Sequence, residues 1–296
     1  MEKEYFAETH AELNKARVVI LPIPYDRTTT YISGARNGPQ AIISASKQLE
    51  FYDQEIKRDI REIGIHTLDE IEPLAGGPLD MINAVEEVVH DLISKDKFIV
   101  MIGGEHSLSL GVIKPIKETY PYLSVLYLDA HADLRESYEG SPYSHACAAR
   151  RIAEVAPTVL VGIRSISEEE SIYVEQEKLK LISMQDIIKD SSTIEATHYW
   201  QDKLIDYLSD DVYISIDLDV LDPSFMPAVG NPEPGGFYWY DILAFLKKVV
   251  ERKKVRGFDV VELCPIPSLK APDFIAAKLI YKILGYIWSA EYRYEI

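Results

Sequence analysis

The sequence predicts an α/β protein of three layers, in which helices cover both faces of a mainly parallel sheet. Three observations lead to this fold class. Short apolar runs alternate along the chain with longer segments of helical periodicity. The runs are apolar throughout, which is typical of strands buried on both faces of a parallel sheet. Acidic residues and histidines gather directly after several runs, at the strand ends where such sheets bind ligands.

Seven apolar runs are predicted to form the strands. They span residues 17–23, 98–103, 124–129, 158–163, 179–183, 211–217 and 255–262. The segments between and after them have the periodicity of helices that pack one face against a sheet. These predicted helices span residues 39–51, 79–95, 107–119, 145–155, 168–178, 193–208, 239–252 and 272–288. The alternation of the two kinds of segment favours parallel strand pairs.

A single domain over residues 1–296 is expected, because the chain contains no linker, charge block, internal repeat or low-complexity segment. Its 296 residues, 47% of them hydrophobic, are enough to bury a large core. The charged N-terminus does not resemble a signal peptide, and no apolar stretch approaches the roughly 18 residues of a membrane span. Cys147 and Cys264 form neither a disulfide framework nor a zinc motif. A cytoplasmic protein without a membrane partner is therefore expected.

The net charge is −17, from 48 acidic and 31 basic residues. Such an excess gives a well-solvated surface, and its negative field would also attract a cationic substrate. Nucleic acid is not an expected partner, because binding to phosphates requires clustered lysine and arginine.

Two acidic segments carry the main functional signal. Asp129, His131 and Asp133 follow one apolar run, and Asp217 and Asp219 follow another. Side chains alternate along an extended chain, so the first three are expected to project to one side, as are the last two. So many carboxylates in one place would repel each other strongly unless a cation neutralised them. A metal site is therefore the preferred interpretation.

A third segment, FIVMIGGEHSLSLG (98–111), supplies another histidine. Gly103 and Gly104 allow the chain to turn tightly before His106, which precedes a predicted helix. If the three strand ends are neighbours, four aspartates balance the charge of two divalent cations. Carboxylates with a minority of imidazoles suit Mn²⁺ better than Zn²⁺. Two such ions about 3.5–4 Å apart would convert a shared water into a nucleophilic hydroxide near neutral pH.

These segments resemble the three signature blocks of the ureohydrolase family, which includes arginase and agmatinase. The three blocks are GGEHS (103–107), DAHAD (129–133) and SIDLDVLDP (215–223). Further segments resemble the glycine-rich N-terminal loop of the family, the loop after the third block and the last strand. They are SGARNGPQAI (33–42), NPEPGG (231–236) and DVVELCP (259–265). The resemblance implies an arginase-like sheet of about eight parallel strands.

The resemblance also implies two Mn²⁺ ions per subunit, with other divalent metals such as Ni²⁺ as alternatives. Each ion would have two ligands of its own, and two aspartates would bridge the ions. The implied ligands are His106 with Asp133, His131 with Asp219, and the bridging Asp129 and Asp217. The implied reaction is attack of hydroxide on a guanidinium carbon, after which the tetrahedral species expels an amine and leaves urea. Asp133 matches the position that passes a proton to the departing nitrogen.

Two more residues are implied to act on the substrate. Glu262 matches the carboxylate that pairs with the substrate guanidinium through strong charge-assisted hydrogen bonds. His145 matches a mobile histidine that shuttles protons or orients the substrate, a role suited to a group that titrates near neutral pH. The candidate catalytic residues are therefore Asp133, His145 and Glu262, and the candidate substrate-binding residues are Glu262 and His145. Asp222 is expected only to form a turn with the proline that follows it.

The expected substrate is a small cationic guanidine, and agmatine, which would give putrescine and urea, is preferred. Arg135 stands where arginase has an asparagine, and the segment after it resembles that of microbial agmatinases. Glu136 and Glu139 in the same loop suit a substrate with a distal cation. The segment AVGN (228–231) departs from the Gly-Thr-Gly pattern of many agmatinases. N1-aminopropylagmatine, a longer polycation of polyamine biosynthesis, is therefore a serious alternative substrate.

Other readings remain open at this stage. Guanidinobutyrate or free guanidine are further possible substrates. A catalytically silent homologue that binds metal or polyamine is the non-enzyme alternative, and the complete set of candidate ligands argues against it. A deacetylase-like enzyme with one metal would not need the second histidine and the paired aspartates. Ureohydrolases commonly form trimers or hexamers, so a homo-oligomer is expected.

Overall fold

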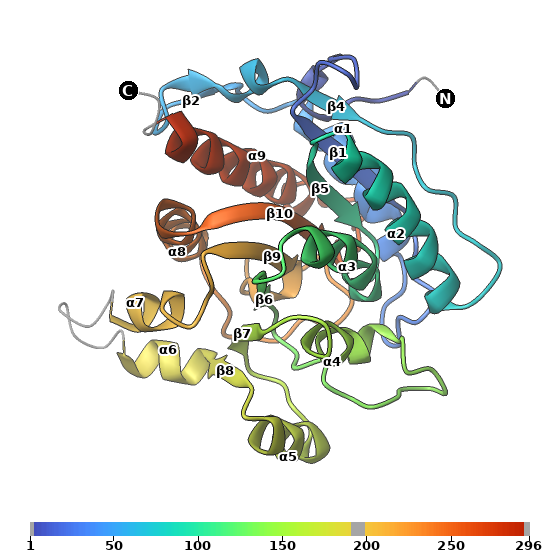
Figure 1. Ribbon diagram of the computed structural model, residues 1–296, viewed down its shortest axis with the longest axis vertical. Coiled ribbons are helices and arrows are strands. Elements are labelled where there is room, and N and C mark those ends of the chain that lie inside the picture. Colours follow the sequence, from blue (N-terminus) through green and yellow to red (C-terminus); the bar gives the residue numbers. More distant parts are fainter. Residues whose placement is uncertain (1–2, 191–198, 293–296) are drawn as a thin grey trace.

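Eight parallel strands form one sheet in the computed structural model, which describes residues 3–190 and 199–292 (Figure 1). Their order across the sheet is β4-β1-β5-β10-β9-β6-β7-β8, and every neighbouring pair is parallel. In chain order they are β1 (Val18–Ile23), β4 (Ile65–Thr67), β5 (Phe98–Gly103), β6 (Ser124–Leu128), β7 (Thr158–Ile163), β8 (Lys180–Ser183), β9 (Asp211–Asp217) and β10 (Lys254–Val261). A separate antiparallel pair consists of β2 (Tyr52–Asp53) and β3 (Arg58–Asp59). The predicted parallel sheet is confirmed.

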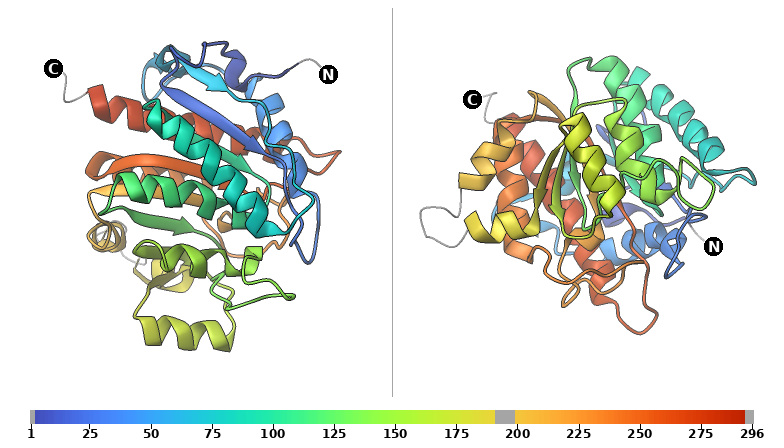
Figure 2. Two further views of the ribbon diagram at one scale, coloured as in Figure 1. Left: turned by 45° about the vertical axis from the view of Figure 1, so that its right-hand side comes forward. Right: turned by 90° about the horizontal axis from the view of Figure 1, so that it is seen from below.

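Two layers of helices cover the sheet. Seen from below, α2, α3 and α4 lie on one side of the strands and α6 to α9 on the other (Figure 2). The buried side chains of these two groups belong to two separate apolar clusters, and α1 shares the cluster of α6 to α9. The helices are α1 (Gly38–Ser46), α2 (Pro78–Ser94), α3 (Ser109–Thr119), α4 (Ala148–Ala153), α5 (Glu168–Glu177), α6 (Met184–Asp190), α7 (Tyr199–Ile205), α8 (Trp239–Arg252) and α9 (Ala271–Tyr292). The three-layer prediction is therefore confirmed.

The sequence pattern explains why these elements form. Strand β1 reads VVILPI and is buried at every position, as a strand covered on both faces must be. Helix α8 buries Ile242, Phe245, Leu246 and Val249, which recur at the three- and four-residue spacing of one helical face. Burial of each such side chain contributes about 1.5–3 kcal/mol relative to an exposed one. The apolar face of the helix is thus fixed against the sheet.

Every predicted strand is present, with ends that differ by a residue at most. The sequence does not predict β4, because its three residues, Ile-His-Thr, are too few to form an apolar run. The sequence also does not predict α6, since this helix follows β8 without an intervening loop.

Two predicted helices begin later than expected. The turns His106–Leu108 and His145–Cys147 are short 3₁₀ segments that precede α3 and α4. Of the helix predicted over 193–208, residues 193–198 lie outside the described residues, and α7 occupies part of the remainder. Among the helices that the structure describes, none is both long and apolar enough to span a bilayer.

The four central strands bring distant segments of the chain together. β5, β10, β9 and β6 are consecutive neighbours in the sheet. Because they are parallel, their carboxyl ends lie along the same edge, where α/β sheets bind ligands. The GGEHS segment follows β5, Glu262 follows β10, Asp217 ends β9 and the DAHAD segment follows β6. The candidate site residues therefore meet at one edge of the sheet.

Candidate active site

The chain leaves the strand direction directly after β6. Asp133 has a φ of 50°, in the left-handed region that costs a non-glycine residue about 1–2 kcal/mol. The chain bends at Ala130, but His131 still pairs in parallel with Ser165, so the extended path expected from Asp129 to Asp133 is interrupted and not absent. The segment is fixed to the turn after β7, since the backbone N–H groups of Arg164 and Ser165 both donate to the carbonyl of Ala130. This attachment stabilises the strained turn.

The segment after β9 turns as well. Leu218–Val220 forms a 3₁₀ turn, and Asp217 Oδ1 caps it by accepting a hydrogen bond of 2.8 Å from Asp219 N. The extended path that we expected between Asp217 and Asp219 is therefore wrong. The acidic side chains converge with a bend at Ala130 in the first segment and a full 3₁₀ turn in the second.

One group of potential ligands surrounds His106, which is fully buried at the start of its 3₁₀ turn. Its Nδ1 atom lies 3.0 Å from Asp129 Oδ2, 3.3 Å from Asp217 Oδ2 and 3.8 Å from Asp133 Oδ2. The donor atoms of His106, Asp129 and Asp217 are close enough together to hold one metal ion.

A second group surrounds His131. Its Nδ1 atom lies 2.8 Å from Asp219 Oδ2 and 3.6 Å from Asp129 Oδ1. The two oxygens of Asp129 therefore face different histidines, so this carboxylate belongs to both groups. Asp217 differs, because it faces only His106 of the two histidines, through Oδ2; its Oδ1 accepts from the Asp219 backbone, as Asp129 Oδ1 does from the His131 backbone. Asp129 is the best-placed carboxylate to bridge two ions.

The hydrogen bonds around His106 prepare it to bind a cation. The Ser215 hydroxyl donates to Asp259 Oδ1 at 2.8 Å, so its oxygen accepts from His106 Nε2–H at 2.9 Å. Nδ1, which faces the aspartates and lies 2.9 Å from the Tyr127 hydroxyl, is then the nitrogen that could bind a cation once it has lost its proton. Asp129 Oδ2 is buried and accepts no hydrogen bond from any described residue. Metal-binding histidines are usually fixed in this way through the nitrogen that does not bind the ion.

The pKa values show how strongly this cluster needs positive charge. Burial raises the pKa of Asp217 well above its usual range, and the Asp219 carboxylate raises it further. Burial alone would lower the pKa of His131, but Asp219 and Asp129 outweigh it and raise that pKa to about 12. Without a cation, the cluster therefore retains protons. Four carboxylates and two imidazoles fit two divalent ions, which would replace those protons.

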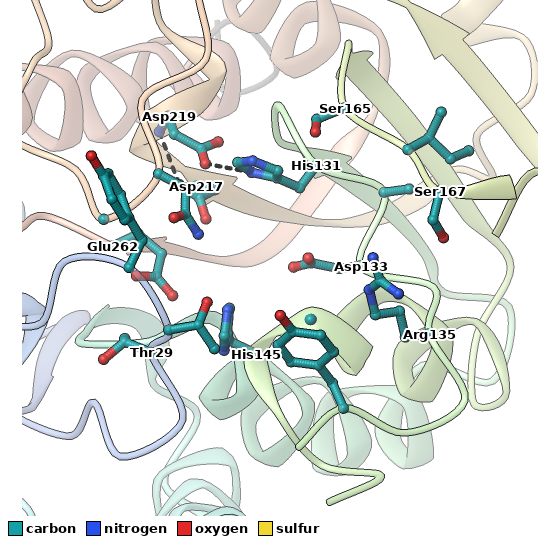
Figure 3. A pocket seen from close by; sticks show the side chains of 18 of the residues that line it. Thr29, His131, Asp133, Arg135, His145, Ser165, Ser167, Asp217, Asp219 and Glu262 are labelled. Carbon is teal, nitrogen blue, oxygen red and sulfur yellow. Dashed lines mark hydrogen bonds and ion pairs between the residues drawn. The ribbon is translucent and has the colours of Figure 1, made fainter. Parts of the chain in front are cut away.

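A cavity of about 270 Å³ opens above the cluster. Asp133, His145 and Glu262 all border it and point into it (Figure 3). Glu262, like Asp133, has a left-handed backbone, with a φ of 66°. Among the described residues, only the backbone N–H of His106 donates to the Glu262 carboxylate, to Oε1 at 2.8 Å. Its other oxygen is left for a ligand in the cavity.

Two further residues support the site. The sequence predicts no role for Arg164 and only a turn at Asp222. The guanidinium of Arg164 donates to the carbonyls of Asp219 at 2.6 Å and Glu233 at 2.8 Å, which joins the third block to the NPEPGG loop. Asp222, for which we expected only a turn, accepts from the backbone N–H groups of Gly235 and Gly236 in the same loop. The only sequence signal for Arg164 is a lone cation at the end of a buried strand.

Gly104 also has a different role from the one expected. Its φ is not positive, so the chain does not need glycine there for a left-handed turn. Any Cβ at this position would instead overlap the carbonyl oxygen of Tyr25. Close approach of two backbone segments therefore explains the glycine, and it brings the loop after β1 against the GGEHS segment.

Known proteins resemble this chain over almost its whole length. Residues 16–285 match the sequence model of the Arginase family. An N(1)-aminopropylagmatine ureohydrolase of Synechocystis sp. is 35% identical over 289 residues, with 95% of this chain and 92% of the relative covered. An agmatinase of Pyrococcus horikoshii is 34% identical, with 93% of each chain covered.

Solved structures resemble it as well. The crystal structure of an agmatine ureohydrolase of Thermoplasma volcanium superposes with a TM-score of 0.89 at 31% identity, and covers 100% of this chain and 98% of that one. An arginase of Bacillus cereus, at 23% identity, has the same fold with a TM-score of 0.76 and covers 90% of this chain and 98% of that one. The family match and the identity of the relatives confirm the resemblance found in the sequence. This chain belongs to the arginase family, the ureohydrolases.

Proposed function

We propose that this protein hydrolyses agmatine to putrescine and urea with two Mn²⁺ ions. One observation carries the proposal: two groups of potential metal ligands and the carboxylate of Glu262 surround a single small cavity. A guanidinium held by Glu262 would lie directly above the cluster. The relatives named agmatinase or aminopropylagmatine ureohydrolase support the same reaction class.

The proposed ligands are those implied by the family, with His106 and Asp133 for one ion and His131 and Asp219 for the other. Asp129 and Asp217 would be shared. This set contains no thiolate and more carboxylates than imidazoles, which favours Mn²⁺ over Zn²⁺ and leaves Ni²⁺ as a second candidate.

Each residue around the cavity would have a separate role in the reaction. Two bound divalent ions would supply the positive charge that activates water for attack on a guanidinium carbon. Glu262 would hold the guanidinium, because a carboxylate facing a row of N–H donors forms charge-assisted hydrogen bonds. Asp133 would pass a proton to the departing nitrogen. The Tyr127 hydroxyl donates to Asp133 Oδ2 at 2.8 Å, which leaves Oδ1 for that transfer. His145 would orient the substrate or exchange its proton.

N1-aminopropylagmatine is the second candidate substrate. Several of the similar relatives carry this activity in their names, at 34–35% identity. The outer part of the cavity also exposes apolar side chains, with Tyr31, Ile32 and Ile166 at 75%, 42% and 43% exposure. These side chains would contact the methylene groups of a longer tail.

Release of urea by the Mn²⁺-loaded protein tests the proposal. Agmatine, N1-aminopropylagmatine, arginine, guanidinobutyrate and guanidine would be compared at equal concentration, with Asp217→Asn as the inactive control. The proposal predicts the highest kcat/KM for agmatine. A higher kcat/KM for aminopropylagmatine would identify that compound, and not agmatine, as the preferred substrate. If the protein bound two metal ions but released urea from none of the five, it would be a silent homologue. One zinc ion per chain together with deacylase activity would favour the deacetylase-like reading.

We further propose that the chain is one domain and forms a trimer or hexamer in the cytoplasm. The connection of all eight strands in one sheet supports the first point. Light scattering of the purified protein would measure the assembly.

A further inference from the structure

Thr28, in the loop after β1, connects two residues that come from other parts of the chain. Its hydroxyl oxygen lies 2.8 Å from Glu105 Oε1 and 3.2 Å from His145 Nδ1. Its backbone N–H donates to Glu105 Oε2 at 2.7 Å, and the backbone N–H of His145 donates to its hydroxyl at 2.9 Å. Glu105 is fully buried. The three residues thus form a chain of contacts that runs from the interior to the cavity.

The number of hydrogen atoms that these three residues can donate determines which group is the donor in each hydrogen bond. A hydroxyl has one hydrogen to donate and two lone pairs to accept with. One lone pair of Thr28 takes the backbone N–H of His145. The Glu105 carboxylate is arranged as an acceptor: Oε2 takes the Thr28 backbone N–H, and Oε1 faces the hydroxyls of both Thr28 and Ser107, so the single hydroxyl hydrogen of Thr28 goes to Oε1. The remaining lone pair of Thr28 then faces His145 Nδ1 at 3.2 Å, closer than the Ser144 hydroxyl at 3.4 Å, which favours a proton on this nitrogen.

We infer that Glu105, acting through Thr28, fixes His145 as the tautomer with the proton on Nδ1 and leaves the Nε2 lone pair for the cavity. Glu105 and Thr28 are positioning residues in this account, because neither borders the reacting atoms. The tautomer follows from the contacts alone, and its value for catalysis rests on the proposed function.

One further contact and the burial of the ring agree with this assignment. The Tyr138 ring meets the His145 ring edge-on, with centroids 6.2 Å apart, and restricts its orientation. Burial lowers the pKa of His145 to about 4, so the ring is neutral at neutral pH and can accept a proton at one nitrogen. His106 is held by the same kind of hydroxyl–carboxylate pair, Ser215 and Asp259, but through its Nε2 atom. The two pairs contact opposite nitrogens, so His106 presents Nδ1 to the aspartates, while His145 would present Nε2 to the cavity that it borders.

The substitution Glu105→Gln gives the sharpest test, because it should reverse the direction of the hydrogen bonds between residue 105, Thr28 and His145. The amide oxygen must remain opposite the Thr28 backbone N–H, which places the NH₂ group opposite the Thr28 hydroxyl. That hydroxyl would then accept from the amide and donate to His145 Nδ1. The variant has nearly the same shape, but it would move the imidazole proton from Nδ1 to Nε2.

The ¹⁵N spectrum of labelled histidines distinguishes the two tautomers directly. It would be recorded on the whole chain, metal-free and loaded with diamagnetic Zn²⁺, and His145→Gln would assign the signals. We expect the Nδ1–H tautomer in the wild type and in Thr28→Ser, and the Nε2–H tautomer in Glu105→Gln. Thr28→Val, which lacks the hydroxyl, should give a mixture. An unchanged tautomer in Glu105→Gln and Thr28→Val would overturn the inference.

Kinetics test the consequence for catalysis. In the Mn²⁺-loaded enzyme, kcat of Thr28→Val should fall by about 100-fold, the lower range for a positioned acid–base group, while KM changes little. Thr28→Ser should restore kcat, which a purely structural role of the threonine methyl would not do. If the wild type released no urea, the proposed function would fail, but the spectra would still decide the tautomer. Wild-type kcat in Thr28→Val would contradict the positioning role.

Discussion

The substitution Glu262→Gln tests how the protein would recognise a guanidinium. In the wild type, Oε1 of Glu262 accepts from the backbone N–H of His106 at 2.8 Å, and the other oxygen faces the cavity. In the variant, the amide oxygen must keep the bond to His106, because a backbone N–H cannot face an NH₂ group. The amide NH₂ would then point at the N–H donors of the substrate.

The size of the effect follows from this geometry. A hydrogen bond to a charged group contributes about 1.5–3 kcal/mol, which corresponds to about 10- to 150-fold in kcat/KM. The variant loses this bond and also sets donor against donor, so a loss of about 100-fold or more is expected. Burial and the Glu105 carboxylate raise the pKa of Glu262 in the free protein, and a bound guanidinium would favour its ionised form again.

Steady-state release of urea from agmatine would measure the loss, with metal content and thermal unfolding checked in parallel. Glu168→Gln is the matched control, because it makes the same chemical change on an exposed residue of the first turn of α5. The control should keep full activity. If Glu262→Gln kept both metal ions and lost less than about threefold in kcat/KM, well below the contribution of such a bond, the guanidinium role would be refuted.

Three further predictions concern the metal cluster and its support. Asp129→Asn should lower metal affinity by more than the roughly 100-fold that is typical when a residue supporting a ligand is lost, since the two oxygens of Asp129 face both histidines. Metal titration checks this, and full occupancy of both sites in the variant would contradict it. Metal binding should tighten as pH rises from 6 to 8, because a pKa of about 12 means that His131 must lose a proton to bind an ion. The affinity should rise by up to about tenfold per pH unit for each proton released. Calorimetry in two buffers counts the released protons, and a count of zero would contradict the prediction. Gly104→Ala should cost about 3 kcal/mol of stability, because its Cβ would overlap the Tyr25 carbonyl; denaturant unfolding checks this, and a neutral result would contradict the close approach.

Much of the fold was predictable because buried parallel strands are continuous apolar runs. Strand β4 was not, since a short Ile-His-Thr edge strand carries too little apolar signal and is defined by its pairing with β1. The approximate position of the site was also predictable, because ligands of α/β sheets gather at the carboxyl ends of strands. The sequence order of the blocks does not reveal that β10 lies between β5 and β9, which is what brings Glu262 next to His106.

The detailed geometry of the site was less predictable. Asp133 and Glu262 adopt left-handed backbones that no local sequence signal indicates, because tertiary contacts impose them. Thr28 and Arg164 act through partners more than 50 residues away in sequence, as with the 77 residues between Thr28 and Glu105. Spacing along the chain reports strands and short motifs. It carries little information on such long-range polar contacts.

Metal content per chain tests the central claim most directly. The wild type and Asp129→Asn would be loaded with Mn²⁺ and desalted, and their manganese content would be measured by inductively coupled plasma mass spectrometry. Convergence of four aspartates and two histidines at one edge of the sheet predicts two ions in the wild type and fewer in the variant. A wild type that retained no ion, or a variant that retained both, would contradict the assignment of this cluster as a two-metal centre.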